Sequence, residues 1–96
     1  MNSADRKCIR VVISGRVQGV GYRYWMMQAA GRFGITGWVR NRYRGDVEAI
    51  VCGRTENINL LLQACRKGPT FANVTEVEVL EQVDGQYSSF EARPTA

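Results

Sequence analysis

The chain has 96 residues, of which 45% are hydrophobic and 23% charged, and its net charge at pH 7 is +4. This composition is typical of a single globular domain, and no stretch reaches the roughly 18 apolar residues of a membrane span. The positive charge favours anionic partners without identifying them. The first residues lack the apolar stretch of a signal peptide, so we expect a cytoplasmic protein.

Histidine is absent from the sequence, which excludes imidazole acid–base catalysis and histidine-ligated metals. The three cysteines, Cys8, Cys52 and Cys65, are an odd number without CxxC spacing. This pattern argues against a disulfide framework or a zinc site. No metal centre is expected.

Apolar periodicity predicts the secondary structure in chain order. Alternating residues predict strands over 8–14, 35–41, 46–52 and 74–83. Helical spacing predicts helices over 22–33 and 55–65, the second capped by Thr55. A short fifth strand is expected within 87–93, with Phe90 and Ala92 facing inward.

The order β-α-β-β-α-β is that of a ferredoxin-like α+β fold, the split β-α-β sandwich. Right-handed crossovers place both helices on one face of an antiparallel sheet of four to five strands. The domain is expected to span residues 8–96, preceded by a flexible tail, 1–7. The first two strands are then parallel with the third between them. Their C-terminal ends meet at one edge, about 9–10 Å apart.

The loop that follows the first strand reaches this edge and contains Gly15, Gly19 and Gly21. A glycine-rich loop that opens a helix turns unpaired N–H groups toward one point, where the helix dipole also favours negative charge. Arg23 lies in the first turn of that helix, where a cation opposes the dipole. An anion, most simply a phosphate, would complete such a site.

Familiar phosphate motifs fail on this loop. A Walker A motif would need a glycine where Val20 stands, and the dinucleotide fingerprint meets Tyr24 in place of its third glycine. What remains at the edge is Arg23 and Asn41, with no acid, base or nucleophile. Such a site suits a leaving group that departs unaided, as in a mixed carboxylic–phosphoric anhydride.

The run Gly15–Arg23 resembles the acylphosphatase signature, and Gly37–Asn41 resembles the second block of that family. The similarity continues through Gly45–Glu48, Gly53, Gly68-Pro69 and Phe90–Arg93, with Tyr22 and Ala92 as mild departures. The resemblance implies hydrolysis of acyl phosphates such as carbamoyl phosphate or 1,3-bisphosphoglycerate, without a cofactor. It also implies a monomer that binds inorganic phosphate or sulfate in the loop.

Carried over to this sequence, the resemblance assigns Arg23 to the phosphoryl oxygens and Asn41 to the attacking water. The backbone amides of the loop complete the phosphate site: Arg16, Val17, Gln18, Gly19, Val20, Gly21 and Tyr22. Arginine offers a planar, permanently charged fork, and an asparagine amide can position water.

Several alternatives stay open. A non-catalytic module that senses a small phosphorylated metabolite would use the same loop. RNA binding is not expected, because the third strand lacks an aromatic platform, and no membrane partner is expected. Further arginines either raise the potential for a polyanionic substrate or form a solvated face: Arg10, Arg16, Arg40, Arg42 and Arg44. Cys8 and Cys52 should face each other across neighbouring strands, where a disulfide fits, although a reducing cytoplasm favours free thiols.

Overall fold

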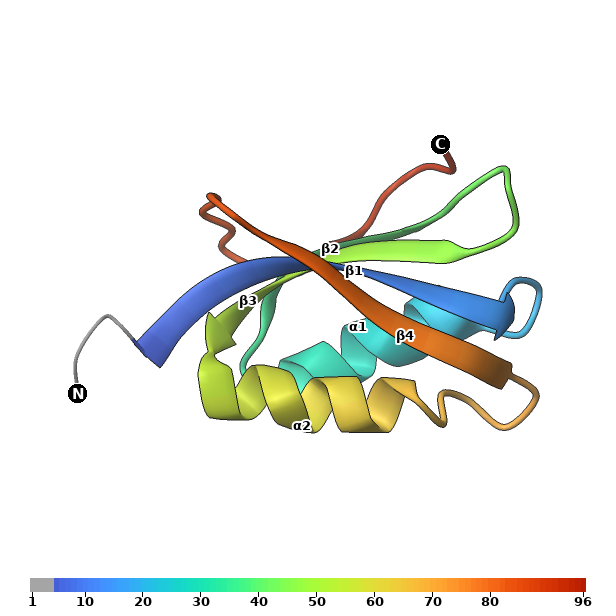
Figure 1. Cartoon of the computed structure of the whole chain (residues 1–96), viewed down its shortest axis with the longest axis horizontal. Coiled ribbons are helices and arrows are strands. Elements are labelled where there is room, and N and C mark those ends of the chain that lie inside the picture. Colours follow the sequence, from blue (N-terminus) through green and yellow to red (C-terminus); the bar gives the residue numbers. More distant parts are fainter. Residues whose placement is uncertain (1–4) are drawn as a thin grey trace.

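The structure is a computed structural model that describes residues 5–96. Its elements follow in the predicted order: β1 (Arg6–Arg16), α1 (Tyr22–Arg32), β2 (Thr36–Asn41), β3 (Val47–Arg54), α2 (Thr55–Cys65), β4 (Asn73–Val83) and β5 (Phe90–Ala92). Both helices cover the same face of the sheet, as expected for the ferredoxin-like fold (Figure 1). No helix within the described residues is long and apolar enough to cross a membrane.

The five strands form one sheet in the order β4-β1-β3-β2-β5. β3 lies between β1 and β2 and is antiparallel to both, so β1 and β2 are parallel as predicted. β5 departs from the predicted antiparallel sheet, because it pairs in parallel with β2. The chain leaves β4 at one edge of the sheet and reaches the other edge before β5 begins, where it runs in the same direction as β2.

Two predicted details at the start of elements need correction. β1 begins at Arg6, and Arg6 and Lys7 already pair with β3, so they do not belong to a tail. The rest of the expected tail, except Asp5, lies outside the described residues. Thr55 does not cap α2: it is the first helical residue, and its hydroxyl donates to the carbonyl oxygen of Asp5 at 2.9 Å. The hydroxyl therefore fastens the chain before β1 to the start of α2.

The main core lies between the sheet and the helices. The predicted apolar stripe of α1 is buried at Tyr22, Met26, Ala29 and Ala30. It packs with buried residues of the sheet and of α2: Val11, Ile13, Val39, Ala49, Val51, Ile58 and Leu61. Phe90 is half-buried against this core, whereas Ala92, expected to face inward, is exposed.

β3 is buried on both of its faces, which the alternating pattern did not predict. On the face away from the helices, Glu48, Ile50 and Cys52 are only 3–6% exposed. Ile50 and Cys52 form a second small cluster with Trp38, against which Cys8, Val83 and Tyr87 pack. The central strand therefore stabilises both sides of the sheet.

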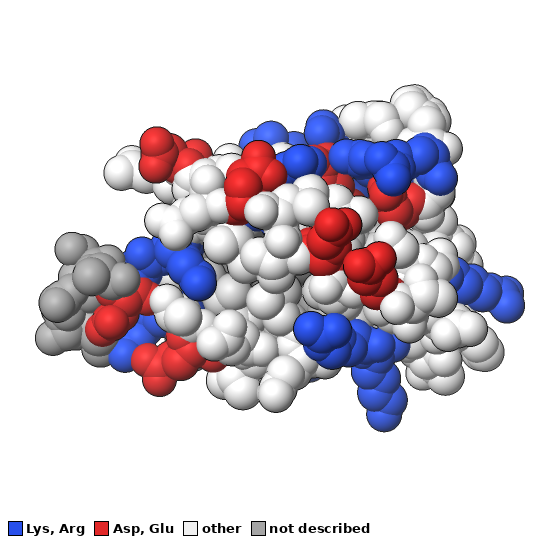
Figure 2. All heavy atoms as spheres, viewed as in Figure 1, with Lys and Arg blue, Asp and Glu red and all other residues white. Residues whose placement is uncertain are grey.

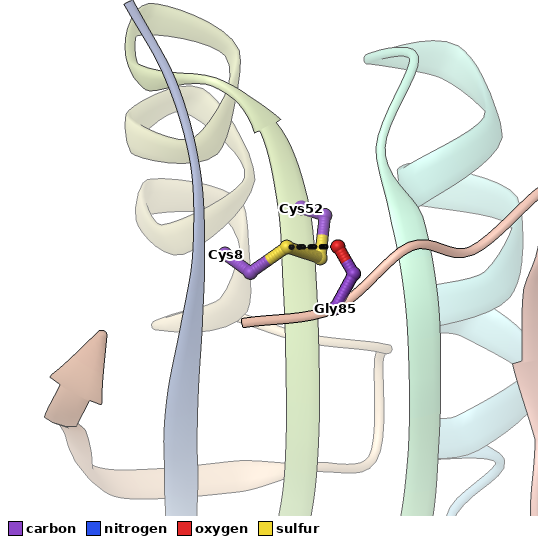
Figure 3. Close-up of a disulfide and its surroundings, with 3 residues drawn as sticks. All are labelled: Cys8, Cys52 and Gly85. Carbon is purple, nitrogen blue, oxygen red and sulfur yellow. Dashed lines mark hydrogen bonds between the residues drawn. A yellow bond between two sulfur atoms is a disulfide. The ribbon is translucent and has the colours of Figure 1, made fainter. Parts of the chain in front are cut away.

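Cys8 and Cys52 are direct partners in the β1–β3 ladder, as the sequence predicted. The structure joins their sulfur atoms in a disulfide (Figure 3). Cys65 is the free, buried cysteine of the described residues. The Gly85 carbonyl oxygen lies 3.5 Å from Cys8 Sγ, a distance at which the reduced thiol could donate a hydrogen bond. Both half-cystines line a hollow of ≈ 390 Å³ at the start of β1, the end of that strand opposite the glycine-rich loop.

Candidate active site

The loop after β1 and the hairpin after β2 lie at the same end of the molecule, at the right of Figure 1. There the structure brings Arg23 and Asn41 into one pocket of ≈ 420 Å³. Its other lining residues are Val17, Gly19, Gly21, Tyr22, Tyr24, Met27 and Ala92. The pocket therefore collects, from separate elements, the two side chains and part of the loop that the sequence placed at this edge.

The backbone of the loop is shaped by two glycines. Gly19 has φ +73° and Gly21 has φ +79°, values that side-chain-bearing residues rarely adopt, although a Cβ at either would meet nothing within 4 Å. Gly21 caps α1 without a side-chain hydrogen bond, and the first turn of α1 holds no acidic residue. Within residues 5–96, the N–H groups of 17–21 donate to no backbone carbonyl. The loop thus offers unpaired backbone N–H groups at the N-terminus of α1, where the helix dipole favours an anion.

Arg23 is half-buried in the first turn of α1. None of the salt bridges among the described residues includes it. A cation at a helix N-terminus costs roughly 0.3–1 kcal/mol when nothing offsets it. Arg23 therefore does not stabilise the fold through an ion pair, and its guanidinium remains available to a ligand.

Asn41 is the last residue of β2, and its backbone is held from both sides. It pairs with Val47 of β3, and its carbonyl oxygen accepts a hydrogen bond of 3.1 Å from the N–H of Ala96. The next residue, Arg42, donates its N–H to Asp46 at 2.9 Å and so closes the hairpin. The side chain of Asn41 is thereby carried on a fixed strand end at the pocket.

The remaining expected loop residues do not line the pocket. Gln18 turns to the hairpin, where its Nε2 donates to the carbonyl oxygens of Arg42 at 2.7 Å and of Asp46 at 2.9 Å. Val20 packs against the core, and Arg16 is exposed at the end of β1. Gln18 therefore ties the middle of the loop to the residue that follows Asn41.

Three pocket residues have no role in the sequence-based site: Tyr24, Met27 and Ala92. Tyr24 and Met27 lie on α1 beside the buried stripe, one and four positions after Arg23. Positions four apart share a helix face, so the spacing from Arg23 could have indicated Met27. Ala92 is brought to the pocket by the parallel pairing of β5 with β2, which the sequence did not predict.

Tyr22 connects the start of α1 to the end of α2. Its buried hydroxyl donates to the Cys65 carbonyl oxygen at 2.7 Å, one of the last-turn carbonyls that a helix leaves without an internal partner. Burial raises the pKa of the Tyr22 hydroxyl and raises that of the Cys65 thiol to about 11. Both groups stay protonated at neutral pH, so Tyr22 acts here as a structural hydrogen-bond donor.

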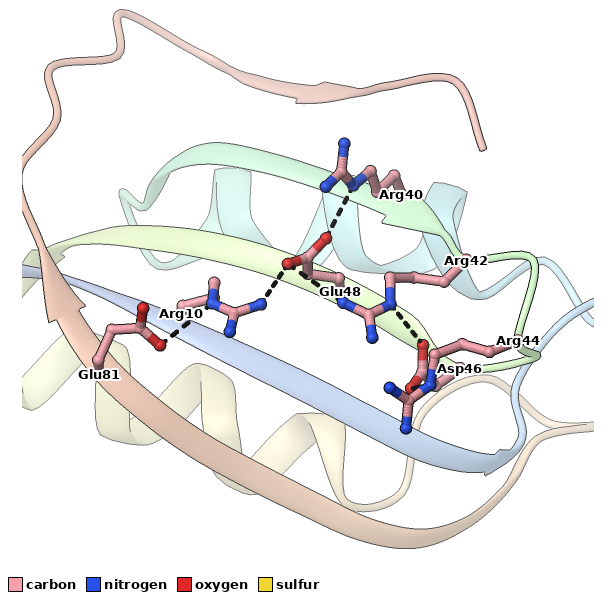
Figure 4. Close-up of polar contacts among 7 residues, drawn as sticks. All are labelled: Arg10, Arg40, Arg42, Arg44, Asp46, Glu48 and Glu81. Atoms are coloured by element: carbon pink, nitrogen blue, oxygen red, sulfur yellow. Dashed lines mark hydrogen bonds and ion pairs between the residues drawn. The ribbon is translucent and has the colours of Figure 1, made fainter. Parts of the chain in front are cut away.

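Four of the arginines that the sequence left unassigned form an arginine–carboxylate cluster with acidic residues on the sheet face away from the helices (Figure 4). Its members are Arg10, Arg40, Arg42, Arg44, Asp46, Glu48 and Glu81. Glu48 is its centre, with Arg10 Nη1 at 2.5 Å, Arg40 Nε at 2.8 Å and Arg42 Nη1 at 3.5 Å. Buried Asp46 holds Arg42 at 3.1 Å and Arg44 at 3.0 Å.

The protonation of Glu48 reflects two opposing effects. Burial raises the pKa of its carboxyl. The hydrogen bonds from Arg10 and Arg40 and the charges of Arg40 and Arg42 lower that pKa by more than burial raises it, so the net shift is downward. The same bond to Glu48, with that to Glu81, raises the pKa of Arg10. The four clustered arginines are thus paired with carboxylates and are not unpaired charges awaiting a polyanion.

The fold and the pocket define a small α+β domain whose glycine-rich loop, arginine and asparagine meet at one sheet edge. A model of the acylphosphatase family matches residues 9–92. The acylphosphatase of Nitrobacter winogradskyi is 55% identical over 69 residues, 72% of this chain and 70% of that protein. That of Thiobacillus denitrificans is 45% identical over 87 residues, 91% of this chain and 97% of that protein.

A solved structure of an acylphosphatase from Coxiella burnetii is similar over almost the whole chain, with a TM-score of 0.90 at 36% identity. The match covers 97% of this chain and 98% of that one. The chain therefore belongs to the acylphosphatase family, whose enzymes hydrolyse acyl phosphates.

Proposed function

We propose that this chain hydrolyses the carboxyl–phosphate bond of acyl phosphates, with Arg23 and the loop amides holding the phosphoryl group and Asn41 holding the attacking water. The observation that carries the proposal is the shared pocket, which Arg23, Asn41, Gly19 and Gly21 all line.

The reaction follows from these positions. The phosphoryl oxygens accept hydrogen bonds from the guanidinium of Arg23 and from the loop N–H groups. These donors stabilise the negative charge on the phosphoryl oxygens in a loose transition state. Water held by the Asn41 carboxamide attacks phosphorus in line with the departing carboxylate. The new P–O bond forms as the bond to the carboxyl oxygen breaks, and a water proton passes to a phosphate oxygen. The products are a carboxylate and inorganic phosphate.

Phosphate release from benzoyl phosphate, measured with a chelator present, tests the activity. Arg23→Ala should abolish both the release of phosphate from the substrate and the binding of inorganic phosphate, yet leave the free energy of unfolding unchanged or raise it by about 0.3–1 kcal/mol, because a cation leaves the positive end of a helix. Arg32→Ala, in the last turn of the same helix, is the matched control and should keep full activity.

Asn41→Ala should lower kcat far more than it weakens inhibition by inorganic phosphate, since Asn41 is proposed to bind water and not the phosphoryl group. Asn59→Ala, an exposed asparagine on α2, serves as control. A wild-type protein that binds phosphate but releases none from benzoyl phosphate would support the sensing module instead. Normal turnover by Arg23→Ala would refute the assigned role of the arginine.

A further inference from the structure

The pocket has a second wall that the proposed chemistry leaves unused. Tyr24, Met27 and Ala92 line it beside Arg23 and Asn41. Tyr24 is 67% exposed, Ala92 is exposed as well, and Met27 rests partly on the core. Of the residues within 5–96 that line the pocket, Arg23 alone carries a charge. This wall is therefore uncharged and contributes mainly apolar surface.

The arginines next to Asn41 in sequence are directed elsewhere. Arg40 and Arg42 bind Glu48, and Arg42 also binds Asp46. In Figure 2 acidic side chains accordingly lie among the basic ones near the hairpin end of the molecule.

Arg93 follows Ala92 in the chain, but its guanidinium lies over Trp38, 5.0 Å from the ring centroid, and 5.9 Å from that of Tyr87. Trp38 belongs to the cluster on the sheet face away from the helices. Arg16 is exposed and is not among the lining residues. A second anionic group on a substrate would thus find none of these cations within the pocket.

We propose that Tyr24, Met27 and Ala92 bind the acyl group of the substrate, and that the preferred substrates are acyl phosphates whose acyl group is uncharged and apolar, either aromatic or branched aliphatic. This inference rests on the proposed function, because a phosphoryl group held at Arg23 fixes one end of the substrate. One oxygen atom joins phosphorus to the acyl carbon, so the acyl group begins inside the same pocket. A volume of ≈ 420 Å³ is within the usual range for small-molecule sites.

The selectivity has two physical causes. An apolar acyl group gains free energy by leaving water against Tyr24 and Met27. A charged acyl group entering the same space would lose hydration without gaining an opposite charge. The positive net charge of the chain therefore does not predict that the pocket prefers bisphosphorylated substrates, since the arginines near the hairpin already have carboxylate partners.

The test compares benzoyl phosphate with 4-carboxybenzoyl phosphate, which adds one anionic group to the same ring, and with acetyl phosphate. Wild type should show a kcat/KM about tenfold higher for benzoyl than for 4-carboxybenzoyl phosphate. Ala92→Lys should lower the ratio of kcat/KM for benzoyl phosphate to kcat/KM for 4-carboxybenzoyl phosphate by about fivefold, because the added cation pairs with the carboxylate. Ser88→Lys, which adds the same charge at an exposed position outside the pocket, should leave the ratio unchanged.

Tyr24→Ser removes the exposed ring of the wall. It should lower kcat/KM for benzoyl phosphate by about fivefold and that for acetyl phosphate by less than about twofold, because acetyl buries little surface there. Phe71→Ser is the control, since Phe71 is 75% exposed and does not line the pocket. Taking each variant relative to wild type cancels the different intrinsic reactivities of the substrates.

Equal kcat/KM values for the two aromatic substrates in wild type would overturn the inference and leave the proposed function standing. So would a Tyr24→Ser variant that slows acetyl and benzoyl phosphate alike, since the wall would then not distinguish acyl groups. Failure to release phosphate from any acyl phosphate would overturn the proposed function, and the inference with it.

Discussion

Glu48→Gln should destabilise the protein by about 2–3 kcal/mol. The side chain of Glu48 is 4% exposed and receives charged hydrogen bonds from Arg10 at 2.5 Å and Arg40 at 2.8 Å. Breaking a fully buried pair costs roughly 3–5 kcal/mol, whereas exposed pairs contribute roughly 0–1 kcal/mol. Arg10 and Arg40 keep 29% and 31% of their side-chain surface in water, which places the expected cost between these limits. For a domain of this size, that cost lowers Tm by on the order of 10–20 °C.

Urea unfolding of the oxidised protein at pH 7 measures this cost, and Glu81→Gln is the matched control. Glu81 binds the same Arg10 at 3.1 Å, but its side chain is 54% exposed, so its loss should cost less than about 1 kcal/mol. Glu48→Gln and Glu81→Gln remove the same charge, which leaves burial and the number of arginine partners as the differences. Equal destabilisation by the two variants would refute the argument from burial.

The pH dependence provides a second check. The folded-state pKa of Glu48 lies below its ordinary value of 4.5. As the pH falls, the unfolded chain therefore binds this proton before the folded one does. The stabilisation by ionised Glu48 is complete above pH 4.5 and is lost as the pH falls through the folded-state pKa. The difference between wild type and Glu48→Gln should accordingly be largest at neutral pH and shrink in acid, and a constant difference from pH 7 to 3 would contradict this linkage.

The other predictions follow from single contacts. Gln18→Met, which removes both hydrogen bonds to the hairpin, should lower kcat by about tenfold with little change in phosphate inhibition. Gln63→Met, at an exposed position of α2, is the control and should leave kcat unchanged. Tyr22→Phe should cost about 1 kcal/mol in urea unfolding and spare turnover, and a loss of activity would show that the hydroxyl serves the site. Cys8→Ser should cost about 3–4 kcal/mol through loss of the disulfide, with kcat within about twofold of wild type. Cys65, whose pKa is raised to about 11, should resist thiol reagents until the chain unfolds.

The order of the elements and the position of the candidate site could be predicted from local patterns. Alternation in β1 and helical spacing in α1 each describe one buried face, and the glycine-rich loop lies between them. The parallel relation of β1 and β2 then places Asn41 at the same edge without any knowledge of side-chain contacts. These features depend on residues close together in sequence and on the handedness of the crossovers.

The features that the sequence missed depend on contacts between distant elements. Glu48 lies between apolar residues in a pattern typical of a solvent-facing position, but arginines from β1, β2 and the hairpin surround it. The parallel β5 strand depends on where the chain crosses the sheet, and the pocket position of Ala92 follows from that pairing. Thr55 has the residue type of a helix cap, yet its hydroxyl binds Asp5, fifty residues earlier. The local structural preference of a residue type predicts such positions poorly, because a partner distant in the sequence determines their role.

Arg40 and Asn41 are neighbours on β2 but serve different faces of the sheet: Arg40 belongs to the arginine–carboxylate cluster and Asn41 to the candidate site. Successive residues of a strand point to opposite sides of the sheet. Arg40 binds Glu48 on the side away from the helices, and Asn41 reaches the pocket near the start of α1. The arginine–carboxylate cluster can therefore fix the end of β2 while contributing no charge to the pocket. Arg23, which gains no ion pair within the described residues, remains the one charged side chain among the described residues that line the pocket.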